Sequence, residues 1–125
     1  MGDTTNRLAG TAFLSVDGNT YQLEGALTYS PVSVLRETLK GQDGVHGYKE
    51  MPEPGKIGGS IRDSGGLTVA DFNAMTNVTL VLQLANGKTV TGSNMWTVDA
   101  IEVDTVDAKF EVKWEGRDGS VVEDL

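Results

Sequence analysis

The sequence predicts a mainly β protein: an antiparallel β-sandwich or barrel with one short flanking α-helix and a long loop. Several segments alternate apolar and polar residues with a period of two, turn residues separate them, and a helical pattern occurs once. At 125 residues the chain has the length of one domain. We therefore expect a single domain over residues 1–125, whose short polar ends at 1–6 and 117–125 are flexible arms.

The first two predicted strands form a hairpin near the N-terminus. Residues 11–17 place Ala12, Leu14 and Val16 on one face. The Asp-Gly-Asn sequence that follows can turn the chain, because these residues tolerate a positive φ. Alternation resumes over residues 20–29, which we expect to pair with the first strand.

A second hairpin is centred on Asn86 and Gly87. Leu80, Leu82 and Leu84 precede this dipeptide at a spacing of two residues, as expected for a strand with one buried face. Asn-Gly suits a type I′ turn, in which both central residues need a positive φ. The sequence therefore predicts two strands joined by a type I′ turn.

The last predicted pair of strands turns around residues 104–107. In the strand that follows, Ala108, Phe110, Val112 and Trp114 alternate with charged residues. Such alternation is typical of a strand with one face in the core and one in water. We expect these four side chains to point inward.

One segment between the strands has a helical pattern. Thr68 can cap the helix, and Asp71 lies at the third helical position, where its charge favours the N-terminal end of the helix dipole. Leu67 can pack on Phe72, and Met75 lies near the same face. A helix this short is stable only when that face packs against a sheet.

Charge and composition exclude several classes of protein. The chain has 10 Lys and Arg residues against 18 Asp and Glu residues, a net charge of −8 at pH 7. Binding to nucleic acid depends on basic residues that neutralise phosphates, so specific nucleic-acid binding is disfavoured. The absence of cysteine excludes disulfides and thiolate metal sites. No run of about 18 apolar residues predicts a membrane span.

The single histidine is the strongest candidate for chemistry. His46 lies near Asp43, Glu50 and Glu53, a composition that could suit a metal or acid–base site. A metal site needs three or four ligands on a rigid scaffold, whereas these residues share a glycine-rich segment without a second histidine. We therefore expect no catalytic, cofactor-binding or metal-ligating residues, and we expect the protein not to be an enzyme.

Residues 30–56 form the predicted long loop. Their periodicity is weak, and connections of this length are uncommon unless they have a function. The segment is also more apolar than a solvated loop requires, which suits contact with another protein surface. The alternative is that it folds over the subunit's own barrel. The expected inter-subunit contact residues are Asp43, Val45, His46, Tyr48, Lys49, Glu50 and Met51.

Four stretches carry a resemblance to a known family: RLAGTAFLSVDGNTYQLEGALTYSP, SVLRETLKGQDGVHGYKEMPEPGKIGGSIRD, LTVADFNAMTNVTLVLQLANGKTV and the strand pair beginning NMWTV. In this order, over roughly residues 7–116, the chain resembles the tail tube proteins of Mu-like contractile-tailed bacteriophages. GQDGVHGYKE followed by IGGSIRD is the most specific part. The resemblance covers nearly the whole chain.

The resemblance implies a structural protein of the virion. It implies a phage tail tube-like fold, hexameric rings stacked into a hollow tube, and a sheath protein around the tube. It also implies assembly in the host bacterial cytoplasm around a tape-measure protein, with baseplate and tail terminator proteins at the ends. The genome would pass through the lumen without specific binding. The family has no catalytic residues to transfer.

The resemblance also implies that strands of the six subunits join into one barrel around the lumen. An acidic wall there would disfavour adhesion of DNA phosphates within about 8 Å. The candidate lumen-facing residues, taken from the polar faces of predicted strands, are Thr79, Gln83, Glu102, Glu111 and Glu115.

Two alternatives remain open. A tube subunit of a phage-derived injection or secretion system would share the architecture and transport proteins instead of DNA. A monomeric β-sandwich module could bind a ligand, for example a carbohydrate, by stacking on Trp96 or Trp114. The alternating pattern around both tryptophans favours the core over the surface.

Overall fold

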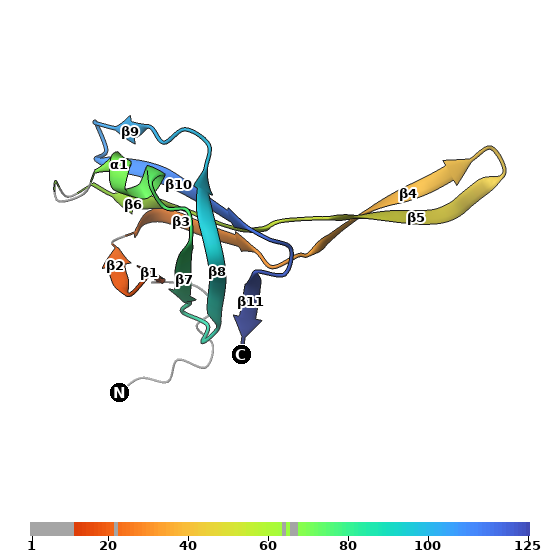
Figure 1. Cartoon of the computed structure of the whole chain (residues 1–125), viewed down its shortest axis with the longest axis horizontal. Coiled ribbons are helices and arrows are strands. Elements are labelled where there is room, and N and C mark those ends of the chain that lie inside the picture. Colours follow the sequence, from red (N-terminus) through yellow and green to blue (C-terminus); the bar gives the residue numbers. More distant parts are fainter. Residues whose placement is uncertain (1–11, 22, 64, 66–67) are drawn as a thin grey trace.

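The computed structural model describes residues 12–21, 23–63, 65 and 68–125, with the backbone alone at 24–26. Most strands form two antiparallel sheets that share a strand, and a separate two-stranded hairpin extends far beyond them (Figure 1). The expected antiparallel β fold with one short helix is confirmed. The N-terminal end that we expected to be flexible lies outside the described residues.

The first sheet contains five antiparallel strands. In spatial order they are β2 (Asn19–Tyr21), β1 (Phe13–Val16), β7 (Val78–Gln83), β8 (Thr89–Val98) and β11 (Val121–Asp124). The presence of β11 corrects our expectation of a flexible arm at 117–125. Val121 is buried and pairs with Gly92, and the pairing with β8 continues to Asp124.

The second sheet shares β8 with the first. Its other strands are β10 (Lys109–Gly116), β6 (Gly55–Arg62), β3 (Leu23–Ser30) and the short β9 (Val103–Asp104) beside β10. β8 changes sheet within its own length, since Gly92 pairs with β7 and β11 whereas Trp96 pairs with Glu115 on β10. Asn94, with a φ of 53°, lies at this bend, and Asn is among the residues that best tolerate this conformation.

The core lies between the two sheets and contains the alternating side chains predicted from the sequence. Leu14 and Leu82 from the first sheet and Phe110 and Trp114 from the second are buried. Ala108 differs from the prediction: it is only partly buried and has a φ of 51°, because it belongs to the turn before β10. The inward alternation therefore begins at Phe110.

The Asn86 hairpin is confirmed, but its turn type is not the predicted one. Gly87 has a φ of 93°, and Asn86 is not among the residues with a positive φ. Leu84 N donates to Lys88 O at 3.0 Å, and Gly87 N donates to Leu84 O at 3.1 Å. This is a three-residue loop with a left-handed glycine, so a type I′ turn is wrong here.

The N-terminal hairpin is confirmed only in part. β1 pairs with β2, with Leu14 opposite Tyr21. The segment expected as one strand over 20–29 is divided, because β3 leaves the first sheet and pairs with β6 in the second. The register of the pairing between β3 and β6 shifts between Leu23 and Leu27.

The helix α1 (Val69–Asn73) covers one end of the sandwich. Thr68 caps it as predicted, accepting a hydrogen bond from Asp71 N at 3.4 Å, and Phe72 is buried. Thr97 Oγ1 of β8 donates to Phe72 O at 3.0 Å and fixes the helix to the sheet. Leu67 lies outside the described residues. In the described part of the chain, no helix has the length and apolar character needed to cross a membrane.

The segment 30–56 is not the irregular loop that we expected. β4 (Val34–Gly41) and β5 (Gly44–Pro52) pair as a regular antiparallel hairpin. The chain then returns to the second sheet as β6. We call residues 34–52 the projecting hairpin.

Candidate functional site

The projecting hairpin is the most exposed ordered part of the described chain. Every residue in it except Val34 is exposed, and β4 and β5 form a sheet of their own (Figure 1). An isolated two-stranded hairpin is only marginally stable in water. The hairpin nevertheless carries five large apolar side chains that are exposed, and they are divided between its two faces.

One face of the hairpin, here called the leucine face, consists of Leu35, Glu37, Leu39, Lys49 and Met51. Leu35 lies opposite Met51, and Glu37 lies opposite Lys49, whose Nζ is 3.2 Å from Glu37 Oε2. Leu35 is 50%, Leu39 42% and Met51 45% exposed. The face therefore presents apolar side chains on both sides of a neutralised ion pair.

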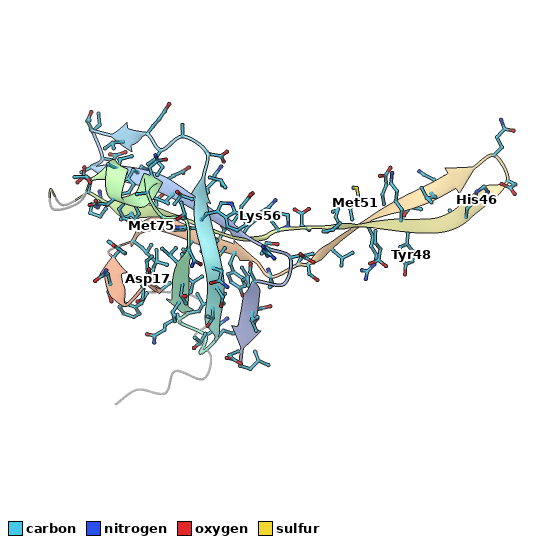
Figure 2. The ribbon with its side chains drawn as sticks, in the orientation of Figure 1. Asp17, His46, Tyr48, Met51, Lys56 and Met75 are labelled. Carbon is cyan, nitrogen blue, oxygen red and sulfur yellow. The ribbon has the colours of Figure 1, made fainter. Side chains whose placement is uncertain are left out.

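The opposite face, here called the tyrosine face, consists of Arg36, Thr38, Lys40, Val45, Tyr48 and Glu50. Arg36 Cζ lies 5.6 Å from the centre of the Tyr48 ring, and Arg36 Nε lies 3.9 Å from Glu50 Oε1. Val45 and Tyr48 are 70% and 59% exposed. Figure 2 shows Tyr48 and Met51 pointing away from each other, as the register requires.

The tip of the hairpin is closed by a local pair. His46 Nε2 lies 2.6 Å from Asp43 Oδ1, and this hydrogen bond lowers the pKa of the Asp43 carboxyl. The His46 ring occupies the space that a Cβ at Gly41 would need. His46 is the unpaired residue of the bulge, since Leu39 pairs with Gly47 and Lys40 with Val45. Among the described residues no group of three or more potential ligands could hold a metal ion.

The root of the hairpin contains all three prolines of the chain, Pro31, Pro52 and Pro54. Glu53 N donates to Ser33 O at 3.0 Å between the two connecting strands. Proline fixes φ and provides no backbone donor, so it restricts the chain and blocks extra strand pairing. The root is thus built to resist bending.

The C-terminal strand supports this root. A Cβ at Gly55 would lie 2.7 Å from Ser120 Oγ and 2.8 Å from Val121 Cγ2, so β6 and the turn before β11 are in close contact. Nearby, Glu123 Oε2 accepts hydrogen bonds from Tyr29 Oη at 2.7 Å and from Lys88 Nζ at 2.8 Å. This cluster connects β11 to β3, the strand that leads into the hairpin. We did not anticipate it from the sequence, because its three members are far apart in the chain.

Charge also separates the hairpin from the rest of the chain. Residues 34–52 contain three cations, Arg36, Lys40 and Lys49, and three carboxylates, Glu37, Asp43 and Glu50. The hairpin is therefore neutral when His46 is neutral, and the net charge of −8 belongs to the remainder.

The structure does not bring the candidate lumen-facing residues together. Thr79 and Gln83 are exposed on the first sheet, whereas Glu111 and Glu115 alternate with the inward residues of β10 on the second. Glu102 is exposed in the connection before β9. A single surface of the subunit therefore cannot present both Thr79 and Gln83 of the first sheet and Glu111 and Glu115 of the second.

The expected contact residues include three of the exposed apolar side chains of the projecting hairpin, all of them on β5. The five apolar residues are Leu35, Leu39, Val45, Tyr48 and Met51, and neither leucine was among the candidates. The sequence contains a signal for the pairing of these two strands. Arg36 and Glu37 before the tip lie opposite Glu50 and Lys49 after it. Complementary charges at such positions indicate cross-strand pairs.

The two tryptophans lie in different environments. Trp114 is fully buried and cannot be a stacking platform, whereas Trp96 is 36% exposed. The expectation that both lie in the core is confirmed only for Trp114. Trp96 alone, on a strand, gives little support for a carbohydrate site.

Comparison with known proteins agrees with this architecture. The model of the phage tail tube protein family matches residues 5–121. No curated protein matches the chain. The fold is similar to a chain in the sheath–tube complex of the extracellular contractile injection system PVC in its extended state, with a TM-score of 0.62, 14% identity, and coverage of 98% of this chain and 95% of that one.

Two further solved structures have the same fold. A chain of the PVC sheath/tube terminator in the extended state gives a TM-score of 0.62 at 15% identity, covering 91% of this chain and 93% of that one. A chain of the anti-feeding prophage cap, the AFP tube terminating cap, gives 0.60 at 13% identity, covering 100% and 99%. The family match spans most of the sequence, and the fold agrees with it: the chain belongs to the phage tail tube protein family.

Proposed function

We propose that this protein is the subunit of the inner tail tube of a contractile-tailed phage. In this proposal six copies form a ring, rings stack into a tube, and the lumen conducts the genome into the host. The observation that carries the proposal is the projecting hairpin, an ordered segment that exposes apolar side chains on both strands in a member of the tail tube family. Exposed apolar patches of this kind mark protein contact sites.

The open edge of β3 supports closure of a ring. β3 has eight residues and pairs with β6 on one side, and no described strand pairs with its other edge. The edge strands of the first sheet, β2 and β11, have only three and four residues. A long open edge is a liability in a monomer and a ready pairing site in an oligomer. Pairing through β3 would join the second sheets of neighbouring subunits into one barrel.

In that arrangement the outward face of the second sheet lines the lumen. This choice includes Glu111 and Glu115 and excludes Thr79 and Gln83. The face is not uniformly acidic, since Glu115 lies opposite Lys56 and Lys113 lies between the two glutamates. In this arrangement the lumen wall has mixed charge, whereas we expected an acidic wall from the sequence.

Ion pairs on this face suit passage of DNA without specific binding. Lys56 Nζ lies 2.9 Å from Glu53 Oε1, and Lys113 Nζ lies 3.8 Å from Asp99 Oδ2. The hydrogen bond and the charge of Glu53 raise the pKa of Lys56, so its charge is maintained. A lysine that is already paired with a carboxylate attracts a DNA phosphate more weakly than an unpaired lysine does.

The proposal includes the partners of such a tube. A sheath protein would surround it, a terminator would close one end and a baseplate the other, and a tape-measure protein would occupy the lumen during assembly in the host cytoplasm. Similarity to chains in a sheath–tube complex and in a terminator and a cap supports the first two partners. We assign no reaction to the protein.

Electron microscopy of the concentrated purified protein tests the proposal. We expect rings or tubes of uniform bore, and slower amide hydrogen exchange in β3 after assembly than before it. A strict monomer at every concentration, with no tube even in the presence of the phage partners, would contradict the proposal. Tubes without added protection in β3 would contradict only the assignment of the ring-closing edge.

A tube of a phage-derived injection system is the second candidate. The similarity in fold to PVC and AFP components supports this second candidate. Capsid and terminase genes beside the gene for this protein would support the phage reading, and their absence would support the injection system. Isolated particles that release protein instead of DNA would establish the second candidate.

A further inference from the structure

The outward face of the second sheet contains a cavity of about 510 Å³. Strands β3, β6 and β10 form its floor, and the end of β8 forms one side. Its volume lies within the range of ligand sites, roughly 300–1,000 Å³. Thr28, Gly58, Ser60 and Glu111 are in its lining, and none of them belongs to the apolar core. The packing of the sandwich therefore does not explain the cavity.

Gly58 keeps the floor of the cavity open. It is paired on both sides, with Thr28 of β3 and Lys113 of β10, where a glycine weakens a strand. Its φ is not positive, and a Cβ at this position would lie 3.6 Å from Lys113 Cγ, an ordinary contact. Neither backbone conformation nor crowding within the subunit requires glycine here. Such a glycine inside a strand marks a place that a ligand or another backbone approaches closely.

The polar groups around Gly58 are mainly hydrogen-bond acceptors. Ser60 is only 8% exposed and lines the cavity, and its hydroxyl makes no hydrogen bond to a described residue. Thr28 Oγ1 donates to Gly58 O at 3.4 Å, so it can only accept from a ligand. Glu111 lies opposite Ser60 and makes no ion pair with a described residue. Three acceptors with at most one free donor among them favour a ligand that donates several hydrogen bonds.

The cations beside the cavity already have partners. Lys56 Nζ lies 2.9 Å from Glu53 Oε1, and Lys113 Nζ lies 3.8 Å from Asp99 Oδ2. A phosphate would have to compete with these carboxylates for the lysines, and it would also be repelled by Glu111. The charge around the cavity therefore complements a cation.

We propose that this cavity binds the ammonium or guanidinium group of a basic protein segment that lies across Gly58. The cation donates hydrogen bonds to Ser60, to Thr28 and to the Glu111 carboxylate, and the charge-assisted bond to the carboxylate is the strongest of them. The missing side chain of Gly58 lets the backbone of the segment approach the sheet. The site is a property of the subunit, whereas its placement in the lumen rests on the proposed function.

Peptide binding to the monomeric protein tests the site. The probe is a capped pentapeptide of glycine with lysine at its centre, and the same peptide with norleucine in place of lysine is the uncharged control. We expect the lysine peptide to cause saturable changes in the amide NMR shifts of Gly58, Ser60 and Glu111. The norleucine peptide should cause none.

Three variants locate the binding. Gly58→Val fills the cavity, and because a Cβ has room there, it should fold with a thermal midpoint no lower than wild type and lose peptide binding. Glu111→Gln should weaken binding at least about tenfold, since hydrogen bonds to charged groups are the stronger ones. Glu102→Gln removes the same charge at an exposed residue outside the lining of this cavity, and it should leave the affinity unchanged.

Three results would overturn the inference. Shifts spread over the acidic surface, or equal weakening by Glu102→Gln and Glu111→Gln, would mean attraction by net charge alone. The same shifts on addition of a DNA duplex would contradict the choice of a cation. Binding of free putrescine as tight as that of the lysine peptide would contradict the choice of a protein segment.

Electron microscopy of the same proteins distinguishes the inference from the proposed function. Wild-type tubes together with no peptide binding would overturn the inference and leave the tube function standing. Peptide binding in a protein that never forms tubes would support the site and overturn the proposed function. A folded Gly58→Val subunit that cannot form tubes would show that another copy approaches Gly58, and would overturn binding of a separate protein segment.

Discussion

The sandwich and the projecting hairpin are both built of antiparallel strands, but the sandwich buries its apolar side chains and the hairpin exposes them. Leu82 of β7 is fully buried between two sheets, whereas Leu35 of β4 is 50% exposed on a strand that pairs with β5 alone among the described strands. The sandwich can be explained by its own contacts, because its apolar side chains meet each other. The apolar side chains of the hairpin meet no such partner among the described residues of the subunit, and they remain exposed.

The largest expected difference is between these two leucines. Leu82→Ala opens a cavity in the core and should lower the free energy of unfolding by about 2–5 kcal/mol. Leu35→Ala removes no buried contact and should change it by less than about 0.5 kcal/mol. Urea unfolding of both variants measures the contrast. Equal losses would mean that the hairpin belongs to the cooperative core of the subunit.

The same contrast explains what could be predicted from the sequence. The strand that ends in Trp114 was predictable because one of its faces is buried and the other is solvated, which imposes alternation. β4 and β5 were not predictable as strands, because both of their faces carry apolar and charged residues. The period-two signal that reveals a strand requires unequal faces, and a hairpin whose two faces are alike lacks it.

Other differences arise from tertiary context. The Asn86–Gly87 dipeptide identified the hairpin, but the pairing of Leu84 with Lys88 set a three-residue loop in place of the type I′ turn. The sequence of β11 does not distinguish it from a tail, because it has four residues and alternates only briefly. Its place against β8 depends on β8 being long enough to pair with two strands in succession, which local sequence does not show.

The next largest effect concerns two glycines. A Cβ at Gly92 would clash with Met95 Sδ and lie 2.9 Å from Ile57 Cδ1, both fully or almost fully buried. Gly92→Ala should therefore lower the free energy of unfolding by about 1–3 kcal/mol through overpacking. At Gly41 the atoms that would clash belong to the exposed His46 ring, which can swing away.

Gly41→Ala should accordingly cost less than about 0.5 kcal/mol, close to an ordinary surface substitution. Thermal unfolding of the pair measures the difference. A large loss at Gly41 would show that the closed tip is required for the fold, and a small loss at Gly92 would show that the bend of β8 has room to adjust.

A smaller effect is expected at the cluster that joins the two regions. The hydrogen bonds from Lys88 and then Tyr29 hold the pKa of Glu123 below its ordinary value of 4.5. A lowered pKa in the folded state stabilises the protein above pH 4.5, and this stabilisation is lost as the pH falls through the lowered value. Glu123→Gln should reduce the thermal midpoint at pH 7.

The pH dependence identifies the cause of that reduction. The midpoints of wild type and Glu123→Gln should converge as the pH falls from about 5 to below the lowered pKa, because protonation removes the charge that the substitution already removed. Glu111→Gln, at an exposed position on β10, is the control and should leave the curve unchanged. A constant difference at every pH would indicate a packing effect at Glu123 instead of its charge.

The most direct test of the contrast concerns the prolines at the root. Replacing Pro31, Pro52 and Pro54 by alanine removes φ restraints without removing core side chains, so the free energy of unfolding should fall by no more than about 1 kcal/mol per site. The direction of the hairpin should become less defined. Spin labels at Gln42→Cys on the tip and Val106→Cys on the sandwich would report it as a broader distance distribution in the monomer.

Lys40→Ala, on the hairpin but remote from the root, is the matched control and should leave the distribution narrow. If the triple variant keeps a narrow distribution, the contacts of Gly55 with Ser120 and Val121 are sufficient to hold the root. If it broadens while the sandwich remains stable, the two regions are separate in the way that their burial suggests. The sandwich then supplies the stability of the subunit, and the prolines fix the direction in which the hairpin projects from it.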